Sequence, residues 1–272
     1  MTEFDPSVLK NLYIPSSDSH KGQNGKVLII AGSTLFHAAS IWPLTVASRM
    51  ADMVFYSSVP ENNEIVEKAK EDFRDGIVIP RSKIENYIEE ADSILIGPGL
   101  SRPEGQESGD DDTKTLTETL LMKYPQKRWV IDGGSLQTMD SSVLLMLTQT
   151  PILTPHPREY QVLFNNMDIQ KAAETYKCVI LLKGEKDEVV SPTQSATVTG
   201  GNAGMTKGGT GDVLAGLVAS LYAKNDAFLS ACAASYINKK AGESLEKRVG
   251  IYFNASDLAD EIPHVMKELL HE

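Results

Sequence analysis

Short apolar segments alternate with longer segments of helical periodicity along most of the chain. The first strand-like run is KVLIIAG at residues 26–32, and the helical pattern that follows over 37–50 contains Pro43, which should kink or delay that helix. Further strand-like runs lie at 53–60, 76–80, 93–100, 128–134 and 151–157. The stretches between them, such as 62–73, 84–91 and 113–124, place their charges on one helical face. This alternation predicts a mainly parallel sheet with helices on both faces.

The C-terminal half departs from that alternation. The strand-like runs at 178–184, 187–191 and 195–201 follow one another closely, which predicts antiparallel strands added to the sheet. Two helical segments come next, and then a helical tail at 256–272 with Ser256 or Asp257 as its expected N-cap. No linker or repeat interrupts the pattern. We therefore expect one α/β domain over residues 1–272, a three-layer α/β/α arrangement with a mainly parallel central sheet.

Charge and composition limit the possible partners. The formal net charge is −11, and the sequence pI is near 5.0. This balance argues against a nucleic-acid or anionic-membrane surface, because both depend on a positive field. Cys178 and Cys232 lie in apolar runs and are expected to be buried thiols, which suits a reducing compartment. With neither a signal-peptide pattern nor an apolar run of membrane-spanning length in the sequence, we expect a soluble, cytoplasmic protein.

Five of the strand-like runs end in small or polar residues. In open α/β sheets, ligands bind beyond the carboxyl ends of the strands, so these ends are candidates for one shared cleft. A glycine at such a turn also serves simply to supply a positive φ, so each end taken alone has a purely structural explanation. The residues concerned are Gly32 and Ser33, Gly97 to Gly99, Asp132 with its two following glycines, His156 and Glu159, and Lys183 and Gly184.

The densest glycine cluster is GGNAGMTKGGTGDVLAG at residues 200–216, which places Asp212 just before an apolar helical run. Glycines before a helix expose successive backbone N–H groups at the positive end of the helix dipole and so favour a phosphate. The spacing fits neither a Walker loop nor a dinucleotide-binding GxGxxG. Asp212 could accept a proton from an attacking hydroxyl while Gly209, Thr210 and Gly211 hold the transferring phosphoryl group. The alternative is that Asp212 only caps the helix.

Two other charged features have a purely structural explanation as well as a functional one. The acidic patch at 102–114 could bind a metal, but no other ligand spacing supports it, and a solvated surface loop is expected. Lys207 could add a cation beside the phosphate site or be an ordinary solvated lysine.

Seven motifs together resemble the ADP/ATP-dependent NAD(P)H-hydrate dehydratases, a branch of the ribokinase-like superfamily. The resemblance runs from about Ser19 to Pro263, and its most specific parts are the TPHP and GGTGD segments in this order. The motifs are SHKGQNGKVLIIAGS, IGPGLS, VIDGGSL, LTPHPREY, LLKG, GNAGMTKGGTGDVLAG and FNASDLADEIP.

This resemblance implies a ribokinase-like fold and a repair reaction. Hydrated NADH or NADPH (NADHX or NADPHX) would be dehydrated at the expense of ADP or ATP, with Mg²⁺ accompanying the nucleotide. Asp212 matches the catalytic base, and Ala39, Gly99 and His156, with Asp212, match positions that contact the hydrate. Glu159 is the residue expected to influence the metal, indirectly. The positions assigned to the nucleotide and its phosphates are Lys183, Gly184, Asn202, Gly208, Gly209, Thr210 and Gly211.

Some positions depart from the family pattern, and other functions stay open. Ala38 replaces a glycine in the first helix, which leaves the shape of the hydrate pocket open. Arg158 replaces a glycine and Asp187 replaces a threonine, so the choice of nucleotide is undecided. We expect no fused epimerase domain. We also expect the protein to form a homo-oligomer. The alternatives are a small-molecule kinase of the same superfamily, which would release a stable phosphate ester, and a non-catalytic nucleotide sensor.

Overall fold

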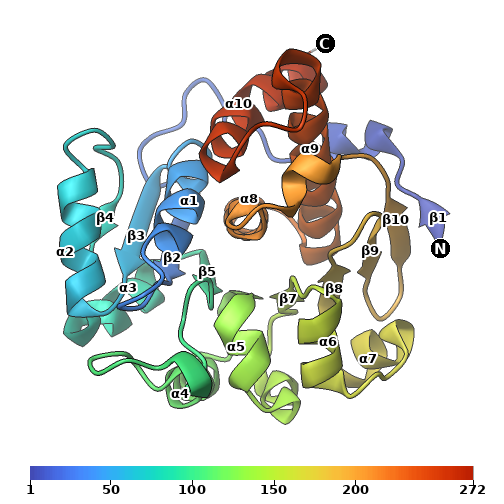
Figure 1. Ribbon diagram of the computed structural model, residues 1–272. Helices are drawn as coiled ribbons and strands as arrows, with labels where there is room; N and C mark the ends of the chain where they lie inside the picture. Colours follow the sequence, from blue (N-terminus) through green and yellow to red (C-terminus); the bar gives the residue numbers. More distant parts are fainter. Residues whose placement is uncertain (272) are drawn as a thin grey trace.

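A mixed sheet forms the centre of the molecule in the computed structural model, which describes residues 1–271 (Figure 1). Across these residues the sheet has ten strands in the order β1-β10-β9-β8-β7-β6-β5-β2-β3-β4. The strands are β1 Thr2–Glu3, β2 Lys26–Ile30, β3 Met53–Ser57, β4 Ile77–Val78, β5 Ser93–Ile96, β6 Arg128–Ile131, β7 Ile152–Leu153, β8 Val179–Leu182, β9 Asp187–Val190 and β10 Ser195–Val198. The ladder from β4 to β8 is parallel throughout, whereas β9 pairs antiparallel with both β8 and β10. The mainly parallel sheet and its antiparallel addition are therefore as the sequence predicts.

Helices cover both faces of this sheet (Figure 1). One face carries α1, α8, α9 and α10, the other α3 to α7, and α2 lies beside β4 at the edge. The bounds are α1 Ala38–Ala47, α2 Pro60–Ala69, α3 Ile84–Glu90, α4 Thr113–Lys123, α5 Gly133–Thr138, α6 Pro157–Phe164, α7 Ile169–Tyr176, α8 Thr210–Tyr222, α9 Ala227–Val249 and α10 Ala255–His271. The expected three-layer α/β/α arrangement is confirmed.

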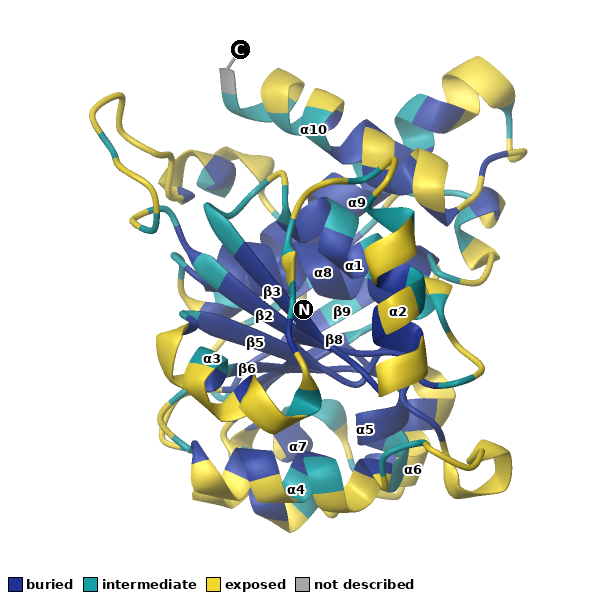
Figure 2. Cartoon of the chain, turned by 90° about the vertical axis from the view of Figure 1, so that its left-hand side faces the viewer, coloured by how far each residue is buried: buried dark blue, intermediate teal, exposed yellow. Residues whose placement is uncertain are grey.

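The alternation of side chains along each strand divides the interior into two cores. In β2, Val27 and Ile29 pack under α1 and α8, while Leu28 and Ile30 face the opposite helices. Since both faces are covered, the parallel strands are apolar at nearly every position. Figure 2 shows the result, with buried strands between helices whose outer faces are exposed.

The two cysteines and α9 lie where the apolar patterns place them. Cys178 and Cys232 are free, buried thiols. The apolar part of α9 is used in the molecule's own core, since Ala231, Ala234 and Ile237 are fully buried. None of the helices within residues 1–271 combines the length and apolar character needed to cross a membrane.

Three local features differ from the sequence predictions. Pro43 does not delay the helix α1, which begins at Ala38 and continues through Pro43, whose ring packs against α8 where Gly216 has no side chain. The tail helix α10 begins at Ala255, and its cap is Asn254, whose Oδ1 accepts the N–H groups of Ser256 and Asp257, so capping by either of those two residues is wrong. The two-residue strand β1, paired with β10, was too short to show a pattern.

Candidate active site

The carboxyl ends of five parallel strands meet along one edge of the sheet. These strands are adjacent in the sheet, in the order β8-β7-β6-β5-β2, so the predicted strand ends lie side by side. Backbone contacts tie the ends together closely. The N–H of Gly32 donates to the carbonyl of Pro98 at 2.8 Å, and a Cβ on Gly97 would lie 1.7 Å from the carbonyl oxygen of Asp132. Gly97 is therefore required by the approach of the neighbouring loop as well as by its φ of 123°.

The helix α8 begins at the glycine cluster. Gly209 occupies the N-cap position with a φ of 93°, and a Cβ there would lie 2.3 Å from the Trp42 ring of α1. The hydroxyl of Thr210 donates to the carbonyls of Met205 and Lys207 and so closes the turn before the helix. Asp212 lies in the first turn, half-buried, and the cap position belongs to Gly209. The alternative that Asp212 serves only as the cap is therefore wrong.

Lys183 is the cation of the site. Its Nζ lies 2.8 Å from Oδ1 of Asp132, which also accepts the hydroxyl of Thr154 at 2.8 Å. The Asp132 carboxylate is buried at the end of β6. The same Nζ lies 3.4 Å from the position that a Cβ on Gly211 would occupy. Lys183 thus connects the β6 carboxylate with the start of α8.

Burial and neighbouring charge change the proton affinities of these groups. Burial, together with the carboxylates of Asp132 and Glu159, raises the pKa of Asp212 to about 7, although Lys183 opposes the shift. The pKa of Glu159 is also raised, mainly by burial and then by Asp132. Burial opposes the charged form of Lys183, but Asp132 and Glu159 outweigh it, so the pKa of this lysine is raised. Asp212 therefore titrates near neutral pH, where a general base is most effective.

His156 and Glu159 form a reciprocal cap at the start of α6. Nδ1 of His156 accepts the N–H groups of Arg158 and Glu159, while the Glu159 carboxylate accepts the N–H of His156 at 2.9 Å. Gln137 donates to the same carboxylate at 2.9 Å. The His156 side chain remains 47% exposed, and its Nε2 lies 3.4 Å from Oε1 of Glu159. Glu159 is buried and already hydrogen-bonded, which fits an indirect role better than direct metal ligation.

Ala39 and Gly99 lie against each other on the other side of the site. A Cβ on Gly99 would be 2.6 Å from that of Ala39 and 3.1 Å from that of Phe36. Gly99 also has a φ of 64°. The loop after β5 and the start of α1 therefore approach at a distance that excludes a side chain at residue 99.

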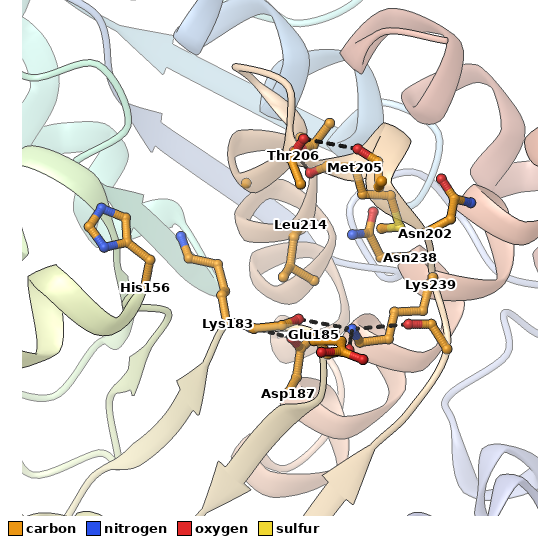
Figure 3. Close-up of a pocket in the computed structure, with 16 residues that line it drawn as sticks. His156, Lys183, Glu185, Asp187, Asn202, Met205, Thr206, Leu214, Asn238 and Lys239 are labelled. Atoms are coloured by element: carbon orange, nitrogen blue, oxygen red, sulfur yellow. Dashed lines mark hydrogen bonds and ion pairs between the residues drawn. The ribbon is translucent and has the colours of Figure 1, made fainter. Parts of the chain in front are cut away.

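A cavity of about 710 Å³ opens beside the glycine cluster. Of the predicted site residues, those that line it are His156, Lys183, Gly184, Asn202, Thr210 and Gly211. Ala39, Gly99, Glu159, Gly208, Gly209 and Asp212 are not part of this lining. In Figure 3, His156 and Lys183 lie at one end and Asn202, Asn238 and Lys239 at the other. The volume is within the usual range for a site that holds a small ligand.

Asn202 supports the cavity wall. Its Oδ1 accepts the N–H of Gly204, and its Nδ2 donates to the carbonyl of Gly242 in α9 at 2.8 Å. These bonds fix the short 3₁₀ turn Ala203–Thr206 against α9. The side chain is thus engaged by protein groups on both sides of its amide.

Lys207 points away from the start of α8. Its Nζ donates to the carbonyl of Ile251 and lies 5.2 Å from the centroid of the Phe253 ring. It therefore holds the loop between α9 and α10 rather than adding a cation beside Asp212.

The acidic patch at 102–114 uses its aspartates for local structure. Asp110 accepts the N–H of Thr34, Asp111 pairs with Arg81, and Asp112 caps α4. No group of three or more His, Cys, Asp or Glu side chains within residues 1–271 is arranged to hold a metal ion.

Several residues of the site have roles that the sequence patterns do not assign. Asp132 was noticed only as a strand end, yet it holds Lys183. Trp42 covers Gly209 from a helix more than 160 positions away, a contact that periodicity cannot show. Asn238 and Lys239 line the cavity from α9. Their signal was present, because two polar residues interrupt the apolar side of AASYINKKAG.

Solved structures with the same architecture define the class of fold. A ribokinase-like superfamily protein from Enterococcus faecalis superposes with a TM-score of 0.85, 24% identity, and coverage of 100% of this chain and 97% of the other. An ADP/ATP-dependent NAD(P)H-hydrate dehydratase from Bacillus subtilis, co-crystallised with ATP and Mg²⁺, superposes with a TM-score of 0.82 at 21% identity and covers 98% of both chains. The fold is ribokinase-like, as the sequence resemblance implies.

Sequence comparison gives the family. The family model described as NAD(P)H-hydrate dehydratase matches residues 27–264, and the chain belongs to this family. The bifunctional NAD(P)H-hydrate repair enzyme of Methanocaldococcus jannaschii is 37% identical over 95% of this chain. The ADP-dependent (S)-NAD(P)H-hydrate dehydratase of Cenarchaeum symbiosum is 32% identical over 94% of this chain and 93% of its own length. The chain spans 51% of the M. jannaschii relative, about half its length.

Proposed function

We propose that this protein dehydrates the S epimer of hydrated NADH and NADPH back to the reduced cofactors, with conversion of ADP to AMP and phosphate or of ATP to ADP and phosphate. The observation that carries the proposal is Asp212, a carboxylate with a pKa of about 7 in the first turn of α8, beside a cavity that can hold a nucleotide. The names of the family and of the two relatives support the same substrate, and the name of the C. symbiosum relative supports the use of ADP.

The proposed chemistry begins with phosphoryl transfer. Asp212 removes the proton from the ring hydroxyl of the hydrate as the hydroxyl oxygen attacks the terminal phosphorus of the nucleotide. A new P–O bond forms, and the bond between that phosphorus and the bridging oxygen of the nucleotide breaks. The ring C–O bond then breaks with loss of inorganic phosphate and of a proton from the adjacent ring carbon, which restores the dihydropyridine.

The N-terminus of α8 and Lys183 are suited to the transferring phosphoryl group. The N–H groups of Gly209, Thr210 and Gly211 belong to the first turn region, where intrahelical acceptors are lacking. The Thr210 N–H donates to the carbonyl of Lys207 at 3.3 Å and would have to exchange or share this bond. Lys183 lies beside Gly211, so its ammonium can contact the same anion. The role of this loop is to stabilise negative charge while Asp212 holds the proton.

Mg²⁺ fits this site as a companion of the nucleotide. Mg²⁺ is commonly held by one or two carboxylates plus substrate phosphates, and it keeps several waters. The Asp132 carboxylate raises the pKa of both Glu159 and Asp212, and Lys183 is the cation that opposes these shifts. When bound, Mg²⁺ would neutralise phosphate charge. Glu159 would act by placing negative charge near the metal, while its own bonds to Gln137 and His156 keep it in place.

The hydrate would lie on the side of Asp212 formed by Ala39, Gly99 and His156. The contact between Ala39 and Gly99 leaves a side-chain-free surface on the loop after β5. His156 has a partly exposed side chain at the start of α6 and lines the cavity. These residues would position the ring hydroxyl, and the cavity lined by Lys183, Gly184 and Asn202 would take the nucleotide.

We further propose a cytoplasmic homo-oligomer. The free thiols of Cys178 and Cys232 support a reducing compartment. Apolar side chains remain exposed in the single chain, including Leu35, Phe36 and Tyr252, which is 85% exposed, and these support association between copies. Light scattering of the purified protein tests the assembly, and a monomer at micromolar concentration would contradict it.

The decisive experiment is recovery of the dihydronicotinamide absorbance from hydrated NADH. Purified protein is mixed with the hydrate, Mg²⁺ and either ADP or ATP, and Asp212→Asn is the control. We expect recovery that requires nucleotide and falls by about 10²- to 10⁴-fold in the variant. A phosphorylated product that persists would support the alternative of a small-molecule kinase, and unchanged recovery in the variant would remove Asp212 from the mechanism.

A further inference from the structure

Asn238 lies at the end of the cavity opposite His156 and Lys183 (Figure 3). It belongs to α9, lines the cavity, and is only 5% exposed. Its Oδ1 is buried and has no hydrogen-bond partner within residues 1–271. A buried acceptor without a donor is unfavourable unless a ligand or water completes it. This side chain is therefore available for a polar group that enters the cavity.

The neighbouring cation is not available for the same purpose. Nζ of Lys239 lies 3.4 Å from Oδ1 of Asp187 and 3.0 Å from the carbonyl oxygen of Glu185. It also donates to the carbonyls of Gly184 and Gly200 at 3.3 and 3.4 Å. Since its charge is balanced and its donors are used, this end of the cavity suits a neutral polar group rather than phosphate.

Apolar surface lies next to Asn238. Leu214 is almost fully buried and lines the middle of the cavity. The Sδ of Met205 lies 2.4 Å from the position a Cβ on Gly242 would have, so this thioether packs against α9 one turn beyond Asn238. Aliphatic groups pack against the faces of a flat aromatic ring, and thioether sulfurs make favourable contacts with such a ring, often at its edge. A heteroaromatic base with polar groups at its edge matches this combination of apolar faces and one amide.

We propose that Asn238 recognises the base of the nucleotide and selects a 6-aminopurine over a 6-oxopurine. This inference rests on the proposed function, which places a nucleotide in the cavity with its phosphates near Lys183. An asparagine amide can accept from the 6-amino group of adenine through Oδ1 and donate to N7 through Nδ2. At this edge a 6-oxopurine presents two acceptors, O6 and N7, so Oδ1 lacks a donor in either orientation of the amide. Asn238 is thus a specificity-determining residue.

Paired nucleotides test this without any mutation. The dissociation constants of ADP, inosine diphosphate and purine riboside diphosphate are measured by calorimetry with Mg²⁺, and each nucleotide is also assayed for NADH recovery. We expect ADP to bind about 10- to 100-fold more tightly than inosine diphosphate. The purine analogue, which lacks the 6-amino group but does not present an acceptor there, should fall between them. Equal affinities for ADP and inosine diphosphate would overturn the inference.

Asn238→Leu removes both polar atoms while keeping similar size. We expect the preference for ADP to fall to within about threefold in this variant. Asn225→Leu is the matched control, because the Asn225 amide bonds Leu221 and Tyr13 away from this cavity, and it should keep the full preference. If Asn238→Leu keeps the preference for ADP over inosine diphosphate, the inference is contradicted, whether or not NADH recovery proceeds. Absence of both ADP binding and recovery in the unmodified protein would instead reject the proposed function, and the inference with it.

Discussion

At the scale of single residues, the pKa of Asp212 sets the pH at which the proposed base can work. Burial and the nearby carboxylates raise this pKa to about 7, so the carboxylate is mostly protonated at pH 6 and mostly ionised at pH 8. Only the ionised form can accept the hydroxyl proton. We therefore expect kcat for NADH recovery to rise about tenfold between pH 6 and pH 8 and then to level off. A profile that is flat across pH 6–8 at saturating substrates would show that another group limits the reaction.

The same shift makes a prediction about stability. A raised pKa means that the folded protein binds the Asp212 proton more tightly than the unfolded chain does. Its contribution to stability is present below the unfolded value of 3.8 and is lost as pH rises through about 7. Asp212→Asn stays neutral, so its melting temperature should gain on that of the unmodified protein as pH increases from 4 to 8. If the difference in melting temperature between Asp212→Asn and the unmodified protein does not change with pH, the raised pKa is contradicted.

At the scale of elements, the start of α8 depends on a glycine that no other residue can replace without strain. Gly209 has a φ of 93°, and a Cβ there would lie 2.3 Å from Trp42. Gly209→Ala should cost at least about 2 kcal/mol through backbone strain and displacement of α1. That loss corresponds to roughly 4–8 °C in melting temperature.

The adjacent Gly208 offers a matched control for stability. Its φ is outside the left-handed region, and no atom lies within 4 Å of the Cβ that alanine would add. Gly208→Ala should leave the melting temperature within about 2 °C of the unmodified protein. Equal losses in the two variants, measured by calorimetry, would mean that the glycine cluster is sensitive for a reason other than the Trp42 contact.

The elements themselves followed from local sequence, because strand and helix periodicities are local properties. The convergence of five strand ends could also be predicted, since parallel neighbours place their carboxyl ends at one edge. Contacts between side chains that are distant in sequence could not be predicted. The bond between Asp132 and Lys183 joins residues 51 positions apart in sequence. Similarly, the cap of α10 is Asn254 because the helix begins at Ala255, before both predicted caps.

At the scale of the whole molecule, the family resemblance indicated the class of reaction, but it did not indicate that the Asn238 amide of α9 lines the cavity. Asn238 and Lys239 lie in a helix that also forms part of the core. A polar pair on a largely apolar helix is compatible with a surface position as well as with a cavity wall. Only packing shows that Asp187 and Lys239 are brought together across β9 and α9.

The overall charge opposes the binding of the proposed anionic substrate. The chain has a formal net charge of −11, and Asp132, Glu159 and Asp212 outnumber Lys183 within the site. A nucleotide therefore approaches against a repulsive field, which mobile ions screen over a length of about 30 Å at 0.01 M salt and about 10 Å at 0.1 M. The association rate of a fluorescent ADP analogue should rise about two- to tenfold over this range, whereas that of uncharged adenosine should stay constant. Stopped-flow fluorescence measures both rates. A rate for the ADP analogue that falls with salt would show that the local cation and the α8 dipole dominate the long-range field.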